Sequence, residues 1–246
     1  MRYNHLMKLG REKSPKDRRT ISLSDIWKID ALDIPVDCHW DRYISDWGIM
    51  GNDRYGNCVT VSKAHMIMAW LSNTRKQDYS IADSYVITES RAIGGLNGFN
   101  ILASVKLWRK RGFFGDKIWA FADLSLNNAL FIQAAVSYFG CVELGVNLPN
   151  AWKGADVWNI GNGRDYTPGS WGGHSVPIVG YDSQYVYVIS WGEIIPMTWD
   201  ALPIFCDEAY TFIDANWLSS TGNTPVGLNL ELIHQKLRDI ENTAFE

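Results

Sequence analysis

Apolar and polar positions follow two different spacings along the chain. In the first half, apolar residues recur every three to four positions over 58–72, 81–89 and 100–111, which is the spacing of a helix with one buried face. After residue 117, shorter segments alternate between apolar and polar residues, as is typical of strands. Helices followed mainly by strands predict an α+β fold, in which a helical half packs against a sheet.

Local signals give the boundaries of these elements. Ser80 precedes the second helix and is expected to be its N-cap, and Gly112 is expected to end the third helix. Residues 149–171, rich in glycine, tryptophan and asparagine, are expected to form a loop that covers a site. The remaining segments are expected as strands over 117–121, 141–147, 174–179, 185–189 and 208–213, helices over 125–139, 197–202 and 228–240, and a short helical turn over 21–27.

Residues 1–22 form a basic, polar segment that we expect to be a solvated arm. This segment lacks the apolar stretch of a secretory signal, so we expect no signal peptide. The rest of the chain, 23–246, is expected to fold as one domain. Within it we expect a helical lobe over about 50–115, an antiparallel sheet or barrel over about 116–215, and the C-terminal helix.

The composition narrows the class of protein. With 246 residues, 46% of them hydrophobic, and a net charge of −4, the chain is expected to be soluble and to have no specific nucleic-acid site. It has no stretch of roughly 18 apolar residues, which a membrane-spanning helix requires. We therefore expect a cytoplasmic or virion-associated protein, with most of its 12 tryptophans in the core.

The four cysteines are Cys38, Cys58, Cys141 and Cys206, and no two of them form a C-x-x-C pair. This spacing gives no zinc site, so we expect free thiols and no metal or other cofactor. Cys58 differs from the other three, because it ends a polar, glycine-rich loop and begins the first helix. Backbone N–H groups at the start of a helix stabilise a thiolate, which makes Cys58 the candidate nucleophile.

His174 follows two glycines at the start of a predicted strand, where its ring can face a cleft. A histidine within reach of Cys58 would serve as the general base. Asn52, six residues before Cys58, offers a side-chain amide to an oxyanion hole beside the Cys58 N–H. These residues predict acyl transfer through a thioester, with a peptide or protein as the substrate.

Three segments resemble motifs of the papain-like cysteine peptidases. Residues 52–58 (NDRYGNC) are similar to the family's Gln…Gly-Ser-Cys, and residues 173–181 (GHSVPIVGY) to its His-Ala-Val-x-x-Val-Gly-Tyr. Residues 188–192 (VISWG) resemble its Asn-Ser-Trp-Gly. The three motifs occur in the family's order, and similar segments occur in uncharacterised papain-like proteins of bacteria and tailed phages. The resemblance implies a papain-like fold and a cysteine peptidase or amidase.

The chain departs from the family at the residue that orients the histidine. Ile189 stands at the family's asparagine position when the segments are aligned from Trp191. Ser190 stands there when they are aligned from Tyr185. Isoleucine makes no hydrogen bond to an imidazole, whereas a serine hydroxyl can. Ser190 is the expected orienting residue, and Asp182 in the neighbouring turn is the alternative.

Several other residues that could carry chemistry are expected to be structural. His65, on the helix that begins at Cys58, is expected to pack against its surroundings. Trp171 and Trp191 are expected to form walls of the site. Three acidic residues are expected on a solvated face: Asp200, Asp207 and Glu208.

Two other functions fit the same residues. One is a cell-wall amidase or endopeptidase, a class in which the cysteine also precedes the histidine, although the Ser-Trp-Gly segment favours the papain-like alternative. The other is a scaffold with weakened catalysis, serving as a phage virion protein or another structural or binding protein, with other virion proteins as partners. The tryptophan-rich loop, the basic arm and the missing asparagine are compatible with this scaffold.

Overall fold

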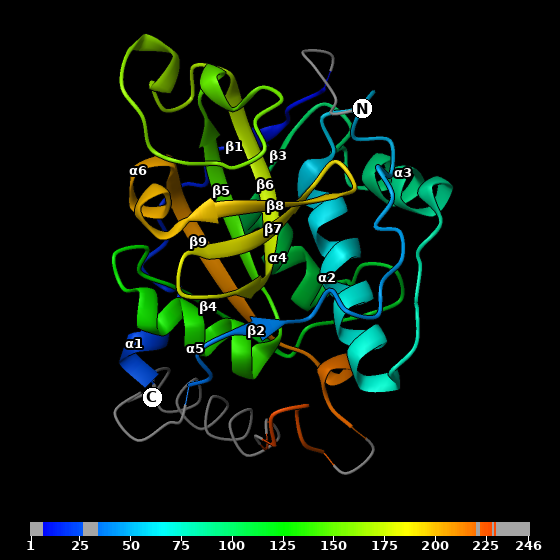
Figure 1. Cartoon of the computed structure of the whole chain (residues 1–246). Coiled ribbons are helices and arrows are strands. Elements are labelled where there is room, and N and C mark those ends of the chain that lie inside the picture. Colours follow the sequence, from blue (N-terminus) through cyan, green and yellow to red (C-terminus); the bar gives the residue numbers. More distant parts are fainter. Residues whose placement is uncertain (1–6, 27–33, 220–221, 228, 230–246) are drawn as a thin grey trace.

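The computed structural model describes residues 7–26, 34–219, 222–227 and 229. Its centre is an open antiparallel sheet with strand order β4-β9-β5-β6-β7-β8, in which β2 also pairs with β6 (Figure 1). The expected alternative of a closed barrel is therefore wrong. The strands of this sheet are β2 (Cys38–His39), β4 (Ala120–Asp123), β5 (Val142–Leu148), β6 (Gly172–Tyr181), β7 (Tyr185–Ser190), β8 (Glu193–Thr198) and β9 (Cys206–Ile213).

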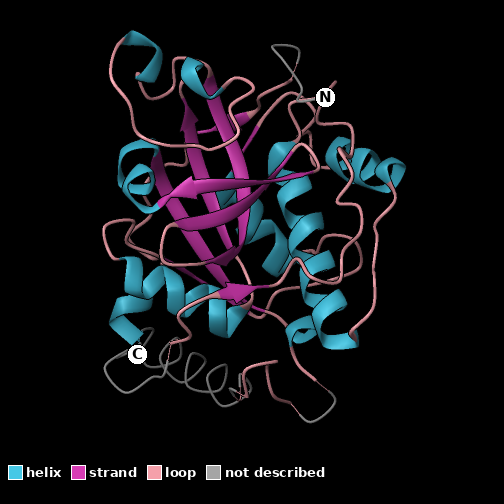
Figure 2. Ribbon diagram, in the orientation of Figure 1, coloured by secondary structure: helices cyan, strands magenta, loops and turns pink. Residues whose placement is uncertain are grey.

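Helices lie alongside and below this sheet in the view of Figure 2. Helix α2 packs against β6, and α5 packs against β5, β6 and β9. Every residue of α2 from Cys58 to Asn73 is buried, so this helix is surrounded by protein along most of its length. The helices are α1 (Leu23–Ile26), α2 (Cys58–Arg75), α3 (Asp83–Ala92), α4 (Ile101–Lys110), α5 (Ala129–Phe139) and α6 (Leu202–Phe205).

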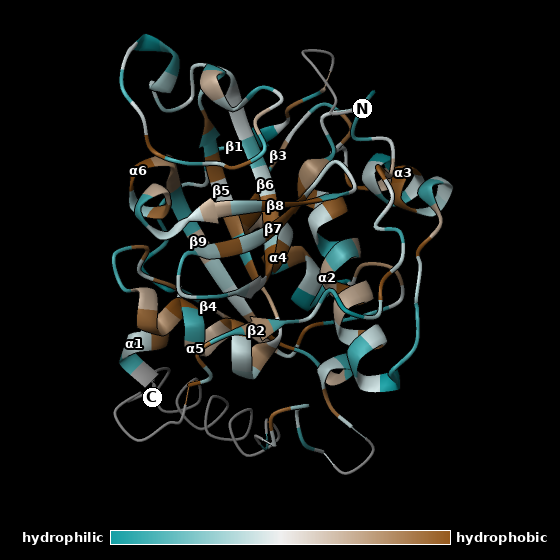
Figure 3. Ribbon diagram, viewed as in Figure 1, coloured by the Kyte–Doolittle hydropathy of each residue, from teal (hydrophilic) through white to brown (hydrophobic). Residues whose placement is uncertain are grey.

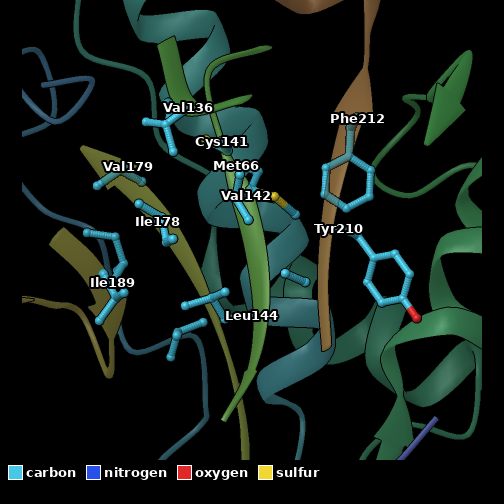
Figure 4. Packing of buried hydrophobic residues seen from close by; sticks show 14 of the residues in the cluster. Met66, Val136, Cys141, Val142, Leu144, Ile178, Val179, Ile189, Tyr210 and Phe212 are labelled. Carbon is cyan, nitrogen blue, oxygen red and sulfur yellow. The ribbon is translucent and has the colours of Figure 1, made fainter. Parts of the chain in front are cut away.

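The core lies where the central strands meet α2 and α5. Leu144 on β5 and Ile178 on β6 are fully buried, as is Met66 on α2 (Figure 4). In Figure 3, hydrophobic segments follow the middle strands, whereas the outlying loops are mostly hydrophilic. A strand buried on both faces needs a nearly continuous apolar sequence, and β6 provides one from Val176 to Tyr181.

Most expected elements form, and their ends differ for local reasons. Asn100 caps α4 and Asn128 caps α5, each accepting a hydrogen bond from the backbone three residues later. Ser80 is not the N-cap of α3, because that helix begins at Asp83 with Ala82 before it. The expected helix over 197–202 is wrong in its first half, since β8 continues to Thr198 and is followed by a 3-10 turn and α6.

The N-terminal segment departs most from expectation. Residues 7–12, here called the strap, are in part buried: Met7 and Arg11 are each 7% exposed. β1 (Arg11–Glu12) in the strap pairs in parallel with β3 (Phe99–Asn100), and β1 also contacts β6. The expectation of a solvated arm is therefore wrong for the strap. The predicted C-terminal helix over 228–240 lies outside the described residues apart from Asn229, which forms an isolated bridge with Asn223.

Candidate active site

The loop before α2 is held by its own side chains. The Asn52 amide nitrogen donates to Tyr55 O at 3.1 Å and to Asn57 Oδ1 at 3.3 Å. The Asn57 amide nitrogen donates to Met50 O at 3.1 Å, and the Asn57 side chain makes no cap at the start of α2, because its Oδ1 accepts from Asn52 instead. Both Asn52 amide hydrogens are thus engaged inside the loop. The expected role of Asn52 in an oxyanion hole requires one of these bonds to exchange.

Cys58 is the first residue of α2 and is almost fully buried, with 1% exposure. Burial raises the pKa of its thiol. Backbone hydrogen bonds from Ser175, Gly10 and Val59 act in the opposite direction. Ser175 directly follows His174, so this bond places the thiol beside the strand segment that carries the candidate base. The start of α2 and the strand β6, which carries His174, therefore lie side by side at Cys58.

His174 lies near the start of β6 and is 1% exposed. Its Nε2 lies 2.9 Å from Ser190 Oγ, and within the described part of the chain its Nδ1 has no hydrogen-bond partner. Burial lowers the pKa of His174 to about 3, because no charged group offsets the loss of hydration. The imidazole is therefore neutral at pH 7, with one ring nitrogen oriented by a hydroxyl and the other unpaired.

Ser190 and Trp191 reach the histidine from a tight hairpin turn. Trp191 and Gly192 both have positive φ, 50° and 81°, between the paired residues Ser190 and Glu193. This is the pattern of a two-residue turn that matches the twist of its strands. The turn stacks Trp191 on the His174 ring, with centroids 4.4 Å apart and an interplanar angle of 17°. Positive φ is costly for a tryptophan, by about 1–3 kcal/mol, so the surrounding structure must stabilise this turn.

The structure distinguishes between Ser190 and Asp182, the two candidates for orienting His174. Ser190 contacts the His174 ring, whereas the Asp182 carboxylate accepts hydrogen bonds from Tyr187 Oη and from the backbone of Gln184 and Tyr185. Ile189 is part of the apolar core of the sheet (Figure 4).

A buried ion pair that the sequence analysis did not identify adjoins the site. Lys63 on α2 binds Glu143 on β5, and both side chains are 0% exposed. Ser175 Oγ donates to Glu143 Oε1 at 2.8 Å, and Ser62 Oγ lies 3.1 Å from Ser175 Oγ. Burial lowers the pKa of Lys63 and raises the pKa of Glu143. The sequence feature that could have indicated this pair is a single charged residue inside the apolar segment that forms α2 and another inside the segment that forms β5.

The strap crosses directly over the site. The backbone of Gly10 acts on the Cys58 thiol in the direction that lowers its pKa. Gly10 also lies so close to the preceding loop that a β-carbon at residue 10 would be 1.9 Å from Gly56 O. On the other side, a β-carbon at Gly173 would be 2.4 Å from Arg11 O. The strap thus lies between the cysteine loop and the histidine strand.

Arg11 anchors the strap through residues that were expected on a solvated face. Its guanidinium binds Asp207 and Glu208 of β9, and the Arg11 side chain is 1% exposed. The expectation is wrong for Glu208, whose side chain is only 9% exposed, whereas Asp207 is an exposed residue although its side chain is 19% exposed. Sequence spacing gave no signal for this contact, since it joins positions almost 200 residues apart.

The remaining candidates are structural in this arrangement. His65 Nε2 donates to Trp47 O at 2.9 Å, and burial lowers its pKa to about 4. The four cysteines are free and buried. Among the described residues, no group of three or more histidine, cysteine, aspartate or glutamate side chains is arranged to hold a metal ion. No described helix combines the length and apolar character needed to span a membrane.

Comparisons with known proteins identify the fold. No family model and no curated protein matches the chain. Among solved structures, xylellain, a cysteine protease from Xylella fastidiosa, matches with a TM-score of 0.62 and 14% identity over 87% of this chain and 98% of that protein. Digestive procathepsin L2 proteinase from Tenebrio molitor larval midgut also matches at 0.62 and 14%, over 86% and 78%. The ragweed pollen cysteine protease Amb a 11 matches at 0.54 and 14%, over 75% and 68%. The chain therefore has the α+β fold of papain-like cysteine proteases.

Proposed function

We propose that the chain is a cysteine peptidase or a related amide hydrolase, with Cys58 as the nucleophile and His174 as the general base. The observation that carries this proposal is the contact between the first turn of α2 and β6: Ser62 Oγ, four residues after Cys58, lies 3.1 Å from the hydroxyl of Ser175, next to His174. The papain-like fold supports the same class of chemistry. The substrate would be a peptide or protein, and the mechanism needs no cofactor.

In the proposed reaction, His174 Nδ1 takes the proton of the Cys58 thiol and the sulfur attacks the carbonyl carbon of the substrate amide. The Cys58 backbone N–H stabilises the oxyanion, and Asn52 joins it if its amide leaves the loop. His174 then protonates the leaving amine, a thioester remains on Cys58, and water activated by His174 hydrolyses it. Ser190 accepts the Nε2 hydrogen and keeps Nδ1 free to act as the base.

The structure with the strap in place corresponds to a resting state. Burial opposes both the thiolate and the imidazolium, because it raises the pKa of Cys58 and lowers that of His174. Gly10 also occupies the space beside the thiol. We therefore propose that the strap must move before substrate enters, and that entry of water and substrate makes the charged pair accessible.

The thiol reactivities test this proposal. In the full chain, iodoacetamide should modify Cys58 faster than Cys38, Cys141 and Cys206, because Cys58 begins helix α2 and the other three thiols do not begin a helix. His174→Ala should slow this labelling at pH 7, whereas the matched control His65→Ala should not slow it. Labelling is followed by mass spectrometry of tryptic peptides. Equal labelling of all four cysteines, or protection of Cys58 alone, would contradict the proposal.

The substrate class needs a separate measurement. Fluorogenic peptide amides and muramyl peptides are offered to the chain and to Cys58→Ala. Release of fluorophore that depends on Cys58 supports a peptidase, and cleavage confined to muramyl peptides would support the cell-wall amidase. A Cys58 that labels rapidly without turnover of either class would favour the scaffold.

A further inference from the structure

We infer that the pocket around the Arg11 guanidinium is a substrate subsite for an arginine side chain, and that Arg11 fills it here as an internal ligand. The inference rests on the proposed function, because it places the subsite beside a reactive thiol. Two observations carry it together. One is a buried guanidinium with all three nitrogens bonded. The other is the path of the strap backbone, which one residue earlier, at Gly10, lies against Gly56 in the loop that leads to Cys58.

The pocket satisfies a guanidinium from several directions. Arg11 Nε and Nη2 donate to Glu208 Oε1 at 2.8 and 2.7 Å, and Nη2 also donates to Asp207. Nη1 donates to Asn147 Oδ1 at 3.2 Å. Two carboxylates and an amide oxygen, all acceptors, match the planar donor fork of arginine. Without a cation the pocket would hold two neighbouring carboxylates in a partly buried place, which is unfavourable.

Gly145 on β5 provides the space for this side chain. A β-carbon at residue 145 would lie 2.6 Å from Arg11 Nε and 2.5 Å from Glu208 Cγ. The register between β5 and β9 also shifts at Gly145 and Val146, beside the paired residue Glu208. The sheet is therefore shaped at this point to admit a long side chain between two strands.

The backbone of the strap takes the path that an extended peptide would need. Phe99 N donates to Gly10 O at 2.8 Å, and the strand pairing continues through Arg11. Arg11 O lies against Gly173 on the opposite side. A peptide held between these two walls presents one residue to Cys58 and the side chain of the next residue to the carboxylates. The chain's own strap is thus a guide to what the cleft accepts.

The strap is held in a way that permits exchange. Its strand pairing covers only two residues, Arg11 and Glu12. Next to the guanidinium lies a cavity of about 660 Å³, bounded by residues 13–18 on one side and by Asp207, Glu208 and Tyr210 on the other. The Lys13 side chain is 78% exposed, and its Nζ lies 3.5 Å from Asp207. The strap is held by the Arg11 contacts, the buried Met7 side chain and this short pairing. If these contacts exchange together, the acidic pocket would attract a basic ligand.

Binding to variants of the full chain separates the subsite from the chemistry. Arg11→Ala/Cys58→Ala empties the pocket and removes the thiol. Isothermal titration with acetyl-Gly-Arg-Gly-amide is compared with the same peptide carrying lysine, citrulline or leucine. We expect arginine to bind at least about tenfold more tightly than its neutral isostere citrulline, and more tightly than lysine, which offers no planar fork. Adding Asp207→Asn/Glu208→Gln should abolish this preference.

Two results would overturn the inference: equal affinity for arginine and citrulline, or an arginine preference that survives loss of both carboxylates. Arg11→Gln, which keeps most of the side-chain volume, replaces Arg11→Ala if the smaller residue does not fold. Fluorogenic peptides with arginine at different positions are then tested on Arg11→Ala with Cys58 intact. Arginine-selective binding without turnover contradicts only the proposed function, and turnover without arginine selectivity contradicts only the subsite.

Discussion

Two cations lie buried close to the candidate site, and they differ in what they connect. Lys63 joins α2 to β5, two central elements of the fold, through Glu143. Arg11 joins the strap to β9 through Asp207 and Glu208. The Lys63 pair is 0% exposed on both sides, whereas Asp207 keeps 19% exposure. A buried ion pair therefore stabilises the core between α2 and β5 in one region, and in the other it holds the strap over the candidate site.

The largest effect should come from breaking the inner pair. Lys63→Met leaves Glu143 buried without its cation and should lower the free energy of unfolding by about 3–5 kcal/mol. Urea denaturation checks the loss. The double variant Lys63→Met/Glu143→Gln removes both charges and should recover a large part of the stability. A single variant as stable as the parent would show that Glu143 is already neutral in the fold.

Acid should weaken the interior through its two buried histidines. The pKa values of His65 and His174 are lowered from 6.5 to about 4 and about 3. At a pH between the lowered and the usual pKa, the unfolded chain therefore binds more protons than the folded chain. Their stabilisation is present above pH 6.5 and is lost as the pH falls. At pH 5 each should account for a loss of about 2 kcal/mol, seen in urea denaturation.

His65→Gln provides the control for this pH dependence. Glutamine does not titrate, so the variant should lose about half of the slope between pH 6.5 and 5. His65 lies outside the proposed mechanism, since it hydrogen-bonds Trp47 O. A slope that stays at its original size would assign the acid sensitivity to other groups.

Removing the outer cation should cost less stability and change reactivity more. Arg11→Met breaks charged hydrogen bonds worth about 1.5–3 kcal/mol each, but the strap can leave and let water reach both carboxylates. The net loss should therefore stay below that of Lys63→Met. Cys58 should label with iodoacetamide faster in Arg11→Met than in the parent. Arg19→Met is a matched control, because Arg19 is exposed and binds Asp17 outside the strap. Unchanged labelling would show that the strap does not limit access.

The smallest effect should follow from Ser190→Ala. One neutral hydrogen bond is worth about 0.5–1.5 kcal/mol, so loss of the contact with His174 should reduce kcat by up to about tenfold. Asp182→Asn, which does not touch the imidazole, should leave kcat unchanged. A larger effect for Asp182→Asn than for Ser190→Ala would reverse the proposed roles.

The sequence was sufficient for most of the fold because its strongest signals are local. The helical spacing after Cys58 predicts α2, and the apolar run after His174 predicts β6, although both elements extend beyond the predicted ends. β8 was missed because its alternation is weak and Pro196 interrupts it. Ser80 was a poor guide to the start of α3, because a residue type alone does not fix where the backbone turns.

Only those residues of the candidate site that lie in short sequence motifs could be predicted from the sequence. Cys58, His174 and Ser190 were identified from short segments, and the structure places His174 and Ser190 in contact. Arg11 was hidden in a basic segment, and its partners, Asp207 and Glu208, were hidden in an acidic one. Only tertiary packing brings these segments together, and a charged segment without a partner in view is normally solvated.

The contact between Gly10 and Gly56 O has a consequence for how mutations at this place would act. Since a β-carbon at residue 10 has no room, sliding the strap by one position would force Leu9 or Arg11 against that oxygen. This steric restriction fixes the position of the strap along the loop, so that Gly10 is the residue beside the Cys58 sulfur. Gly10→Ala adds a methyl group at this contact. It should displace the strap from the site without changing any charge in the molecule.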